Sequence, residues 1–175
     1  MPIEESLQHL VVGMFEKQQF YIERTEQQFL VDQVEILPEP NWKRTMNFKM
    51  LSPLTISVAK ENNGKLMPQY LRTNDPSLGD AIQKNMLNKF RSLYGKEPDE
   101  EDFHCMLDEH FINDRGGHEK ISKLITIKQG QPGETKVRGF MCPITITGNP
   151  NLIKLAHESG LGEKGSLGFG MIEVK

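Results

Sequence analysis

The C-terminal stretch GLGEKGSLGFGMIEV (residues 160–174) is the most informative part of this sequence. Its first eleven residues contain five glycines and one lysine, Lys164. Glycine tolerates positive φ and lets other groups come close to the backbone, so consecutive N–H groups in such a loop can face an anion, and the lysine adds a mobile cation. The pattern predicts either a phosphate-binding loop or a tight helix-to-strand connection that needs several left-handed glycines.

Two common nucleotide-binding motifs fit this stretch poorly. Gly160, Gly162 and Gly165 match G-x-G-x-x-G, but that motif needs a strand before the loop, a helix after it and an acid about 20 residues further on. Here a helix is expected before the loop and a strand after it, and only ten residues follow Gly165. The P-loop pattern fails because Ser166, not lysine, follows Gly165. A nucleotide-binding enzyme is therefore the poorest of the alternatives.

Hydrophobic periodicity predicts the elements that surround the loop. Asn149 and Pro150 are typical of a helix start, and Gly160 is typical of a helix end. Asn62-Asn63-Gly64 is a turn signal, and the acidic, histidine-containing segment 97–118 is expected to be a loop. The expected helices are 4–17, 75–93 and 149–159, and the expected strands are 19–23, 28–37, 44–50, 54–58, 121–128, 136–147 and 168–174.

From Arg44 onward these elements follow the order β-α-β-β-α-β, which is the ferredoxin-like order: a four-stranded antiparallel sheet with two helices on one face. The segment PEPN (38–41) breaks the pattern and predicts a domain boundary. We expect an α+β protein in which residues 41–175 form a complete ferredoxin-like unit. Residues 1–40, with the order α-β-β, are expected to be the C-terminal remnant of a first such unit whose opening part is missing.

Four stretches also carry a family resemblance. The glycine loop has two Gly-hydrophobic-Gly triplets, 160–162 and 168–170, with Lys164 between them. Together with FKMLSPL (48–54), NMLNKF (85–90) and KVRGF (136–140), it resembles the CRISPR-associated endoribonucleases of Cas family six. The resemblance extends from about Glu4 to the end of the chain, and the glycine loop is its specific part.

This resemblance implies two tandem ferredoxin-like units and cofactor-free, metal-independent processing of CRISPR repeat RNA. In that reaction the RNA 2′-hydroxyl attacks the adjacent phosphate and leaves a cyclic phosphate. The family's general base, often histidine, lies upstream of the helix that corresponds to residues 4–17. We therefore expect this chain to lack it, and the catalytic residues stay unknown. The alternative is a non-catalytic RNA-binding or scaffold subunit of a CRISPR ribonucleoprotein complex.

RNA contacts are expected from the glycine loop and from locally basic segments. The net charge of −3 does not exclude RNA, because residues 41–60 and 81–96 contain lysine and arginine but no acid. Solvated surface charge is the alternative explanation for each segment. The predicted RNA-binding residues are Gly160, Gly162, Lys164, Gly165, Ser166, Gly168 and Gly170 in the loop, and Lys43, Arg44, Lys136 and Arg138 outside it.

The remaining polar residues give weaker signals. His104, Cys105, Asp108 and His110 are close in sequence, but their spacing matches no common zinc site, so no metal is expected. His9 is expected on the surface, His118 is unremarkable, and His157 could approach bound RNA just before the glycine loop. Cys105 and Cys142 make no disulfide framework, and no apolar run is long enough to span a membrane. We expect a cytoplasmic protein.

Repeat RNA is the main expected partner, with other Cas effector subunits as further candidates. If residues 4–37 fold without further strands, they expose a sheet edge and an apolar helix face. A homodimer formed through this part of the chain is therefore a further expectation.

Overall fold

The computed structural model describes residues 8–9, 11–13, 16, 19–22, 27–33, 35, 38–62 and 64–175. The chain divides into two compact units, Met1–Glu39 and Pro40–Lys175. In the first unit, residues 8–9, 11–13 and 16 are helical, and β1 (Gln19–Ile22) and β2 (Gln27–Leu30) form an antiparallel hairpin. The rest of the expected helix 4–17 lies outside the described residues. The strand expected at 28–37 ends at Leu30, because Leu30 pairs with Gln19, the first residue of β1.

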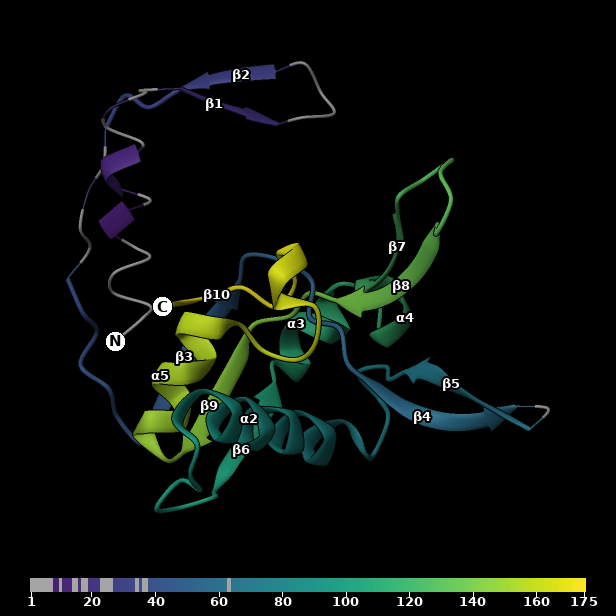
Figure 1. Ribbon diagram of the computed structural model, residues 1–175. Coiled ribbons are helices and arrows are strands. Elements are labelled where there is room, and N and C mark those ends of the chain that lie inside the picture. Colours follow the sequence, from purple (N-terminus) through teal and green to yellow (C-terminus); the bar gives the residue numbers. More distant parts are fainter. Residues whose placement is uncertain are drawn as a thin grey trace. The chain divides into compact units, whose positions relative to one another are not determined.

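The second unit is built on a four-stranded antiparallel sheet with the order β10-β3-β9-β6. Its strands are β3 (Thr45–Met50), β6 (Phe103–Leu107), β9 (Ile144–Gly148) and β10 (Ile172–Val174). Helices α2 (Leu78–Tyr94) and α5 (Pro150–Ser159) cover one face of this sheet (Figure 1). The result is a mixed α+β architecture.

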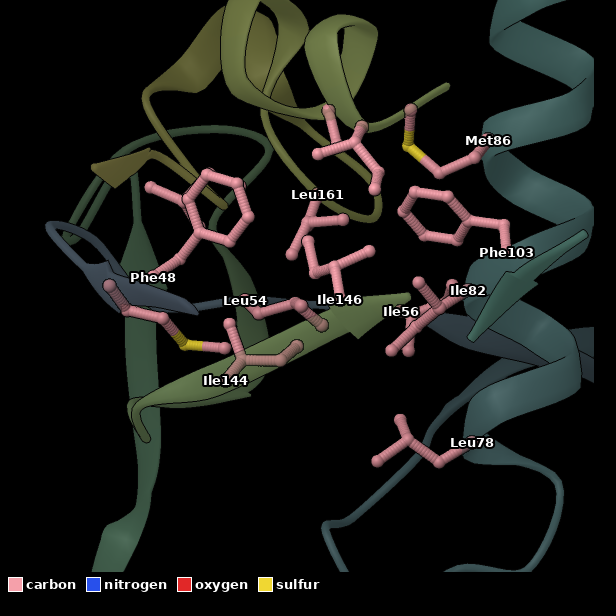
Figure 2. Close-up of a cluster of buried hydrophobic side chains, with 14 of the residues drawn as sticks. Phe48, Leu54, Ile56, Leu78, Ile82, Met86, Phe103, Ile144, Ile146 and Leu161 are labelled. Atoms are coloured by element: carbon pink, nitrogen blue, oxygen red, sulfur yellow. The ribbon is translucent and has the colours of Figure 1, made fainter. Parts of the chain in front are cut away.

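The hydrophobic core lies between this sheet and the two helices. The period-two alternation in β3 points Met46, Phe48 and Met50 inward, and Thr45, Asn47 and Lys49 outward. Figure 2 shows side chains from four sources meeting here: the strands, α2, the segment after β3 and the C-terminal loop. The labelled members include Phe48, Leu54, Ile56, Ile82, Met86, Phe103, Ile144, Ile146 and Leu161, all buried.

The start of α5 and the end of α2 are formed by the residues that the sequence indicates. The Asn149 side chain accepts a hydrogen bond from the Asn151 N–H, with Pro150 in the first helical position. At the end of α2, Gly95 adopts the left-handed conformation, and its N–H donates to the Arg91 carbonyl. The expected helix starts at 75 but α2 starts at Leu78, because Asp75 instead accepts hydrogen bonds from the Ser77 N–H and hydroxyl.

The second and third strands of the central sheet, counted along the chain, differ from those that the sequence predicts. The stretches expected to supply them, 121–128 and 136–147, instead contribute a separate hairpin of β7 (Ser122–Ile127) and β8 (Thr135–Phe140). The second expected stretch is divided at residues 141–143, where Pro143 has no N–H for a ladder. Its remainder is β9, which pairs with β6.

The predicted loop at 97–118 was therefore wrong. It contains β6, the helix α3 (Glu109–Asp114) and the first residue of α4 (His118–Ile121). The strand predicted at 54–58 was also partly wrong, because Leu54 forms only an isolated bridge with Phe140 and β4 (Ser57–Asn62) starts later.

A second separate hairpin lies between β3 and α2 in the chain. In it, β4 pairs with β5 (Lys65–Tyr70), a strand that the sequence analysis missed. Pro68 lies inside β5, and proline is tolerated in such a strand because one edge of a two-stranded hairpin needs no donors. No helix within the described ranges is both long and apolar enough to cross a membrane.

Candidate nucleic-acid interface

The glycine loop runs from the end of α5 to β10 and is folded back on itself. The Leu161 N–H donates to the Gly170 carbonyl at 2.8 Å, which closes the loop across its base. The side chains of Leu161 and Phe169 are buried beneath it. A single 3₁₀ turn, η1 (Gly165–Leu167), forms its tip. The loop therefore has a packed base and an exposed tip.

The segment that follows β3, residues 52–57, anchors the base of this loop. The Gly170 N–H donates to the Pro53 carbonyl at 2.9 Å, and the Glu163 N–H donates to the Thr55 carbonyl at 2.8 Å. In return, the Ser57 N–H and hydroxyl each donate to the Glu163 carboxylate at 3.0 Å. Two sequence motifs more than 100 residues apart thus form one structural element.

Close backbone packing explains two of the glycines, one against this segment and one within the loop. Gly162 and Gly170 both have φ of +74°. A Cβ built on Gly162 would overlap the Thr55 carbonyl oxygen, and one built on Gly170 would overlap the Leu161 carbonyl oxygen. Both residues are buried, as is Gly160. These three predicted RNA-binding residues hold the loop together and offer little surface to a ligand.

The other predicted loop residues lie at the tip, which comprises residues 164–168. Gly165, Ser166 and Gly168 are exposed, and Lys164 is half-buried. Lys164 adopts a left-handed conformation with φ of 60°, which is unusual for a residue with a side chain. Its carbonyl accepts the Leu167 N–H at 2.9 Å and closes the turn. A ligand would therefore meet residues 164–168 rather than the loop base.

Thr55 links β8 to the loop at Arg138, one of the two predicted RNA-binding residues on this strand. The Thr55 hydroxyl donates to the Arg138 carbonyl at 2.9 Å, while the Thr55 carbonyl accepts from Glu163. Lys136 and Arg138 are two residues apart on one strand, so they share a face. The Arg138 guanidinium donates to the Ser122 hydroxyl at 3.0 Å, and Lys136 is exposed.

Lys43 and Arg44 are not brought to the loop. They precede β3, whereas the loop is anchored after β3, so the six-residue strand, roughly 17–20 Å long, lies between them and Pro53. The Arg44 guanidinium lies 2.7 Å from a Glu100 carboxylate oxygen and 3.2 Å from one of Asp102. Its charge is thus engaged within the protein, although the RNA-binding prediction for it stays a prediction.

Lys89 on α2 contacts the start of the loop. The sequence analysis counted this residue only as part of a basic segment. Its ammonium donates to the Gly160 carbonyl at 2.6 Å and to the Ser159 carbonyl at 3.2 Å. Partial burial lowers the pKa of Lys89, but a cation is favoured at a helix C-terminus. Its position in the motif NMLNKF, one of the four that carry the resemblance, was the available signal.

The weaker candidates are placed elsewhere. Alternation along β6 sends His104 outward and Cys105 inward, Asp108 caps α3, and His110 pairs with Asp114 at 2.9 Å. The described residues contain no group of three side chains placed to hold a metal ion.

Two further histidines have partners within the protein. The His118 Nδ1 lies 2.9 Å from the Thr73 hydroxyl, and the His157 ring packs against Trp42 with centroids 5.3 Å apart. His9 is exposed.

Comparison with known proteins places the chain in a family. Residues 37–174 match the model described as CRISPR associated protein Cas6, C-terminal. The chain belongs to this Cas6 family.

Among its relatives is an endoribonuclease-like Cas6 protein of Pyrococcus furiosus, which is 26% identical over 171 residues, covering 98% of this chain and 64% of the relative. The CRISPR-associated endoribonuclease Cas6 1 of Methanocaldococcus jannaschii is 24% identical over 171 residues, covering 98% and 60%.

Solved structures agree with this placement. The product of a Cas6-related gene from Pyrococcus furiosus superposes with a TM-score of 0.78 at 25% identity, covering 98% of this chain and 63% of that protein. A protein described as a RAMP protein binding different RNA substrates gives a TM-score of 0.77 at 22% identity, covering 98% and 65%. The chain thus spans less than two thirds of the relatives that it matches.

Proposed function

We propose that this chain binds CRISPR repeat RNA and serves in its processing, with the tip of the glycine loop and the outward face of β8 as the contact surface. Membership of the Cas6 family supports CRISPR repeat RNA as the ligand. The strand order β10-β3-β9-β6 with two helices on one face supports a ferredoxin-like RNA-binding unit over residues 41–175. Residues 1–40 are proposed to belong to a separate unit of the same kind.

The arrangement of Glu163 and Lys164 is the observation that carries this proposal. These adjacent residues have opposite charges, but the Glu163 carboxylate is held by the Ser57 N–H and hydroxyl. Lys164 projects from a left-handed position next to the exposed glycines 165 and 168. Within the described part of the chain Lys164 has no ion-pair partner, so an RNA phosphate would be its first.

The reaction proposed for the processed RNA is the metal-independent one, in which the 2′-hydroxyl attacks the adjacent phosphate. The Methanocaldococcus jannaschii relative is named an endoribonuclease, and the Pyrococcus furiosus relative is named endoribonuclease-like. A non-catalytic RNA-binding subunit is the second candidate function. It is favoured by the positions of His118 and His110, which contact Thr73 and Asp114 and belong neither to the loop tip nor to β8, the proposed contact surface. No residue of this chain is proposed as catalytic.

Filter binding of the host genome's repeat RNA at several salt concentrations tests the proposed interface. Lys164→Ala should weaken binding and reduce the slope of log K against log salt by about 0.7, the value for one phosphate on a single strand. Lys49→Ala is the matched control, because Lys49 already pairs with Glu173 at 2.8 Å. An unchanged slope for Lys164→Ala would remove the loop from the interface.

Cleavage separates the two candidate functions. Repeat RNA incubated with the chain in EDTA should yield a product with a cyclic phosphate if the chain cuts by the proposed reaction. Binding without such a product would instead favour the non-catalytic subunit.

A further inference from the structure

A groove with a volume of about 430 Å³ lies beside the glycine loop. We call it the β4–α2 groove, because the start of β4 and the first half of α2 form its walls, with Glu163 of the loop at its edge. The residues that the argument uses are Ile56, Ala81, Lys84, Asn85, Asn88 and Glu163. Its volume lies in the lower part of the range for small-ligand pockets, roughly 300–1,000 Å³.

The groove combines an apolar floor with a few polar groups. Ala81 is half-buried and offers a small apolar surface to a flat ring, while Ile56, which also lines the groove, is buried. Asn85 and Asn88 are three residues apart on α2 and therefore lie on one helix face. Asn88 Oδ1 already accepts from the Arg91 guanidinium at 3.0 Å, which leaves the Asn88 amide nitrogen to face a ligand.

Asn85 has an unusual environment. Its Oδ1 is shielded from solvent and has no hydrogen-bond partner among the described residues. An unpaired buried acceptor destabilises the folded protein. Because this oxygen makes no hydrogen bond, turning the amide toward the groove breaks none, and a donor bound there would satisfy it.

The charges of the groove favour a neutral ligand over a phosphate. Two carboxylates, Asp80 and Glu163, lie along it against one ammonium, Lys84. The acceptors Asn85 Oδ1 and the Glu163 carboxylate instead suit a ligand that carries N–H donors.

The position of the groove relates it to the loop tip. Glu163 lines the groove, and the next residue, Lys164, belongs to the tip, with consecutive Cα atoms about 3.8 Å apart. A phosphate at Lys164 and a base in the groove can therefore belong to neighbouring positions of one RNA strand. Single-stranded RNA is commonly recognised through bases that leave the stack and are read on their edges.

We propose that the β4–α2 groove binds one unstacked nucleobase of the RNA and, through Asn85, selects a base that carries its amino group at purine C6 or pyrimidine C4, which is adenine or cytosine. This inference rests on the proposed RNA-binding function and adds a base-reading site to it. Adenine and cytosine present an amino group where uracil presents an oxygen, and an asparagine amide can pair with adenine through two hydrogen bonds. The Asn85 amide can turn to meet uracil, but the Glu163 carboxylate, held by Ser57, stays an acceptor to which an amino group can donate and the uracil oxygen cannot.

Fluorescence anisotropy with labelled single-stranded 12-mers of A, C and U tests this on the full chain. The wild type should bind the A and C oligomers about 5- to 100-fold more tightly than the U oligomer. Asn85→Leu should lose this preference and bind the U oligomer unchanged. Asn113→Leu, at an exposed position on α3, is the control and should keep the preference.

A second variant guards against misfolding of the first. Ala81→Met fills the groove from the helix without adding a polar group and should also abolish the preference. The thermal unfolding midpoint of Asn85→Leu should not fall below that of the wild type, since the variant removes an acceptor that has no partner among the described residues. The midpoint of Ala81→Met should stay close to that of the wild type.

Equal affinity of the wild type for the three oligomers, or a preference that survives both variants, would overturn the base-reading site. If these results come with salt-dependent binding that Lys164→Ala weakens, the proposed RNA-binding function still stands. If no oligomer and no repeat RNA binds to the folded chain, both proposals are wrong.

Discussion

Replacement of Gly162 by alanine tests whether this glycine serves packing or ligand binding. Gly162 has φ of +74°, and alanine in that region costs roughly 1–2 kcal/mol. The added methyl group would also overlap the Thr55 carbonyl oxygen, which is backbone and cannot swing aside. Moving it weakens the 2.8 Å hydrogen bond from Glu163, worth about 1 kcal/mol. The total expected loss in free energy of unfolding is about 2–3 kcal/mol.

Gly168→Ala is the matched comparison within the same loop. Gly168 has φ of +81°, but a Cβ built there has nothing within 4 Å. The Gly168→Ala substitution should therefore lower the free energy of unfolding only through conformational strain, by roughly 1–2 kcal/mol. Urea unfolding followed by far-UV circular dichroism gives both values. Equal losses for the two variants would refute the argument that the base of the loop is packed and its tip is open.

Three further outcomes are expected. Lys89→Met should lose roughly 2 kcal/mol of stability, as it frees the Ser159 and Gly160 carbonyls, and should weaken RNA binding without changing the salt slope; a slope reduced by about 0.7 would mean that Lys89 contacts a phosphate. Burial raises the pKa of Cys105 to about 12 and of Cys142 to about 11, so both thiols are protonated at pH 8 and should react with a thiol reagent slowly until urea unfolds the protein; rapid native labelling would contradict this. Ile146→Ala should cost about 2–5 kcal/mol, read from the urea midpoint, because Ile146 is fully buried; a loss below about 1 kcal/mol would be inconsistent with that packing.

Local sequence signals were sufficient to predict the elements whose ends are set by nearby residues. The alternation in β3, the asparagine and proline that start α5, and the glycine that ends α2 each act through nearby backbone groups, so they can be recognised in one dimension. The glycine loop and the motifs around it were also sufficient to indicate the Cas6 family, which the comparison then showed.

The sheet partners could not be predicted in the same way. Segments 103–107 and 122–127 are both short strands, but 122–127 gives the stronger strand signal, because acids and histidines flank residues 103–107. Only 103–107 is in the central sheet, because it pairs with β9 along its full length and buries Phe103 beneath α2. Strand pairing depends on partners distant in sequence, and those partners are chosen by packing.

The candidate interface shows the same contrast between local sequence signals and contacts that form only on folding. The sequence by itself determined that five glycines and a lysine lie together, and that basic segments are separated from acidic ones. Only the tertiary structure decided that Gly162 and Gly170 are packing positions, that Lys89 holds the loop and that Arg44 is paired with Glu100 and Asp102. The physical reason is that a residue's chemistry is local, whereas its hydrogen-bond and charge partners are supplied by chain segments that meet only on folding.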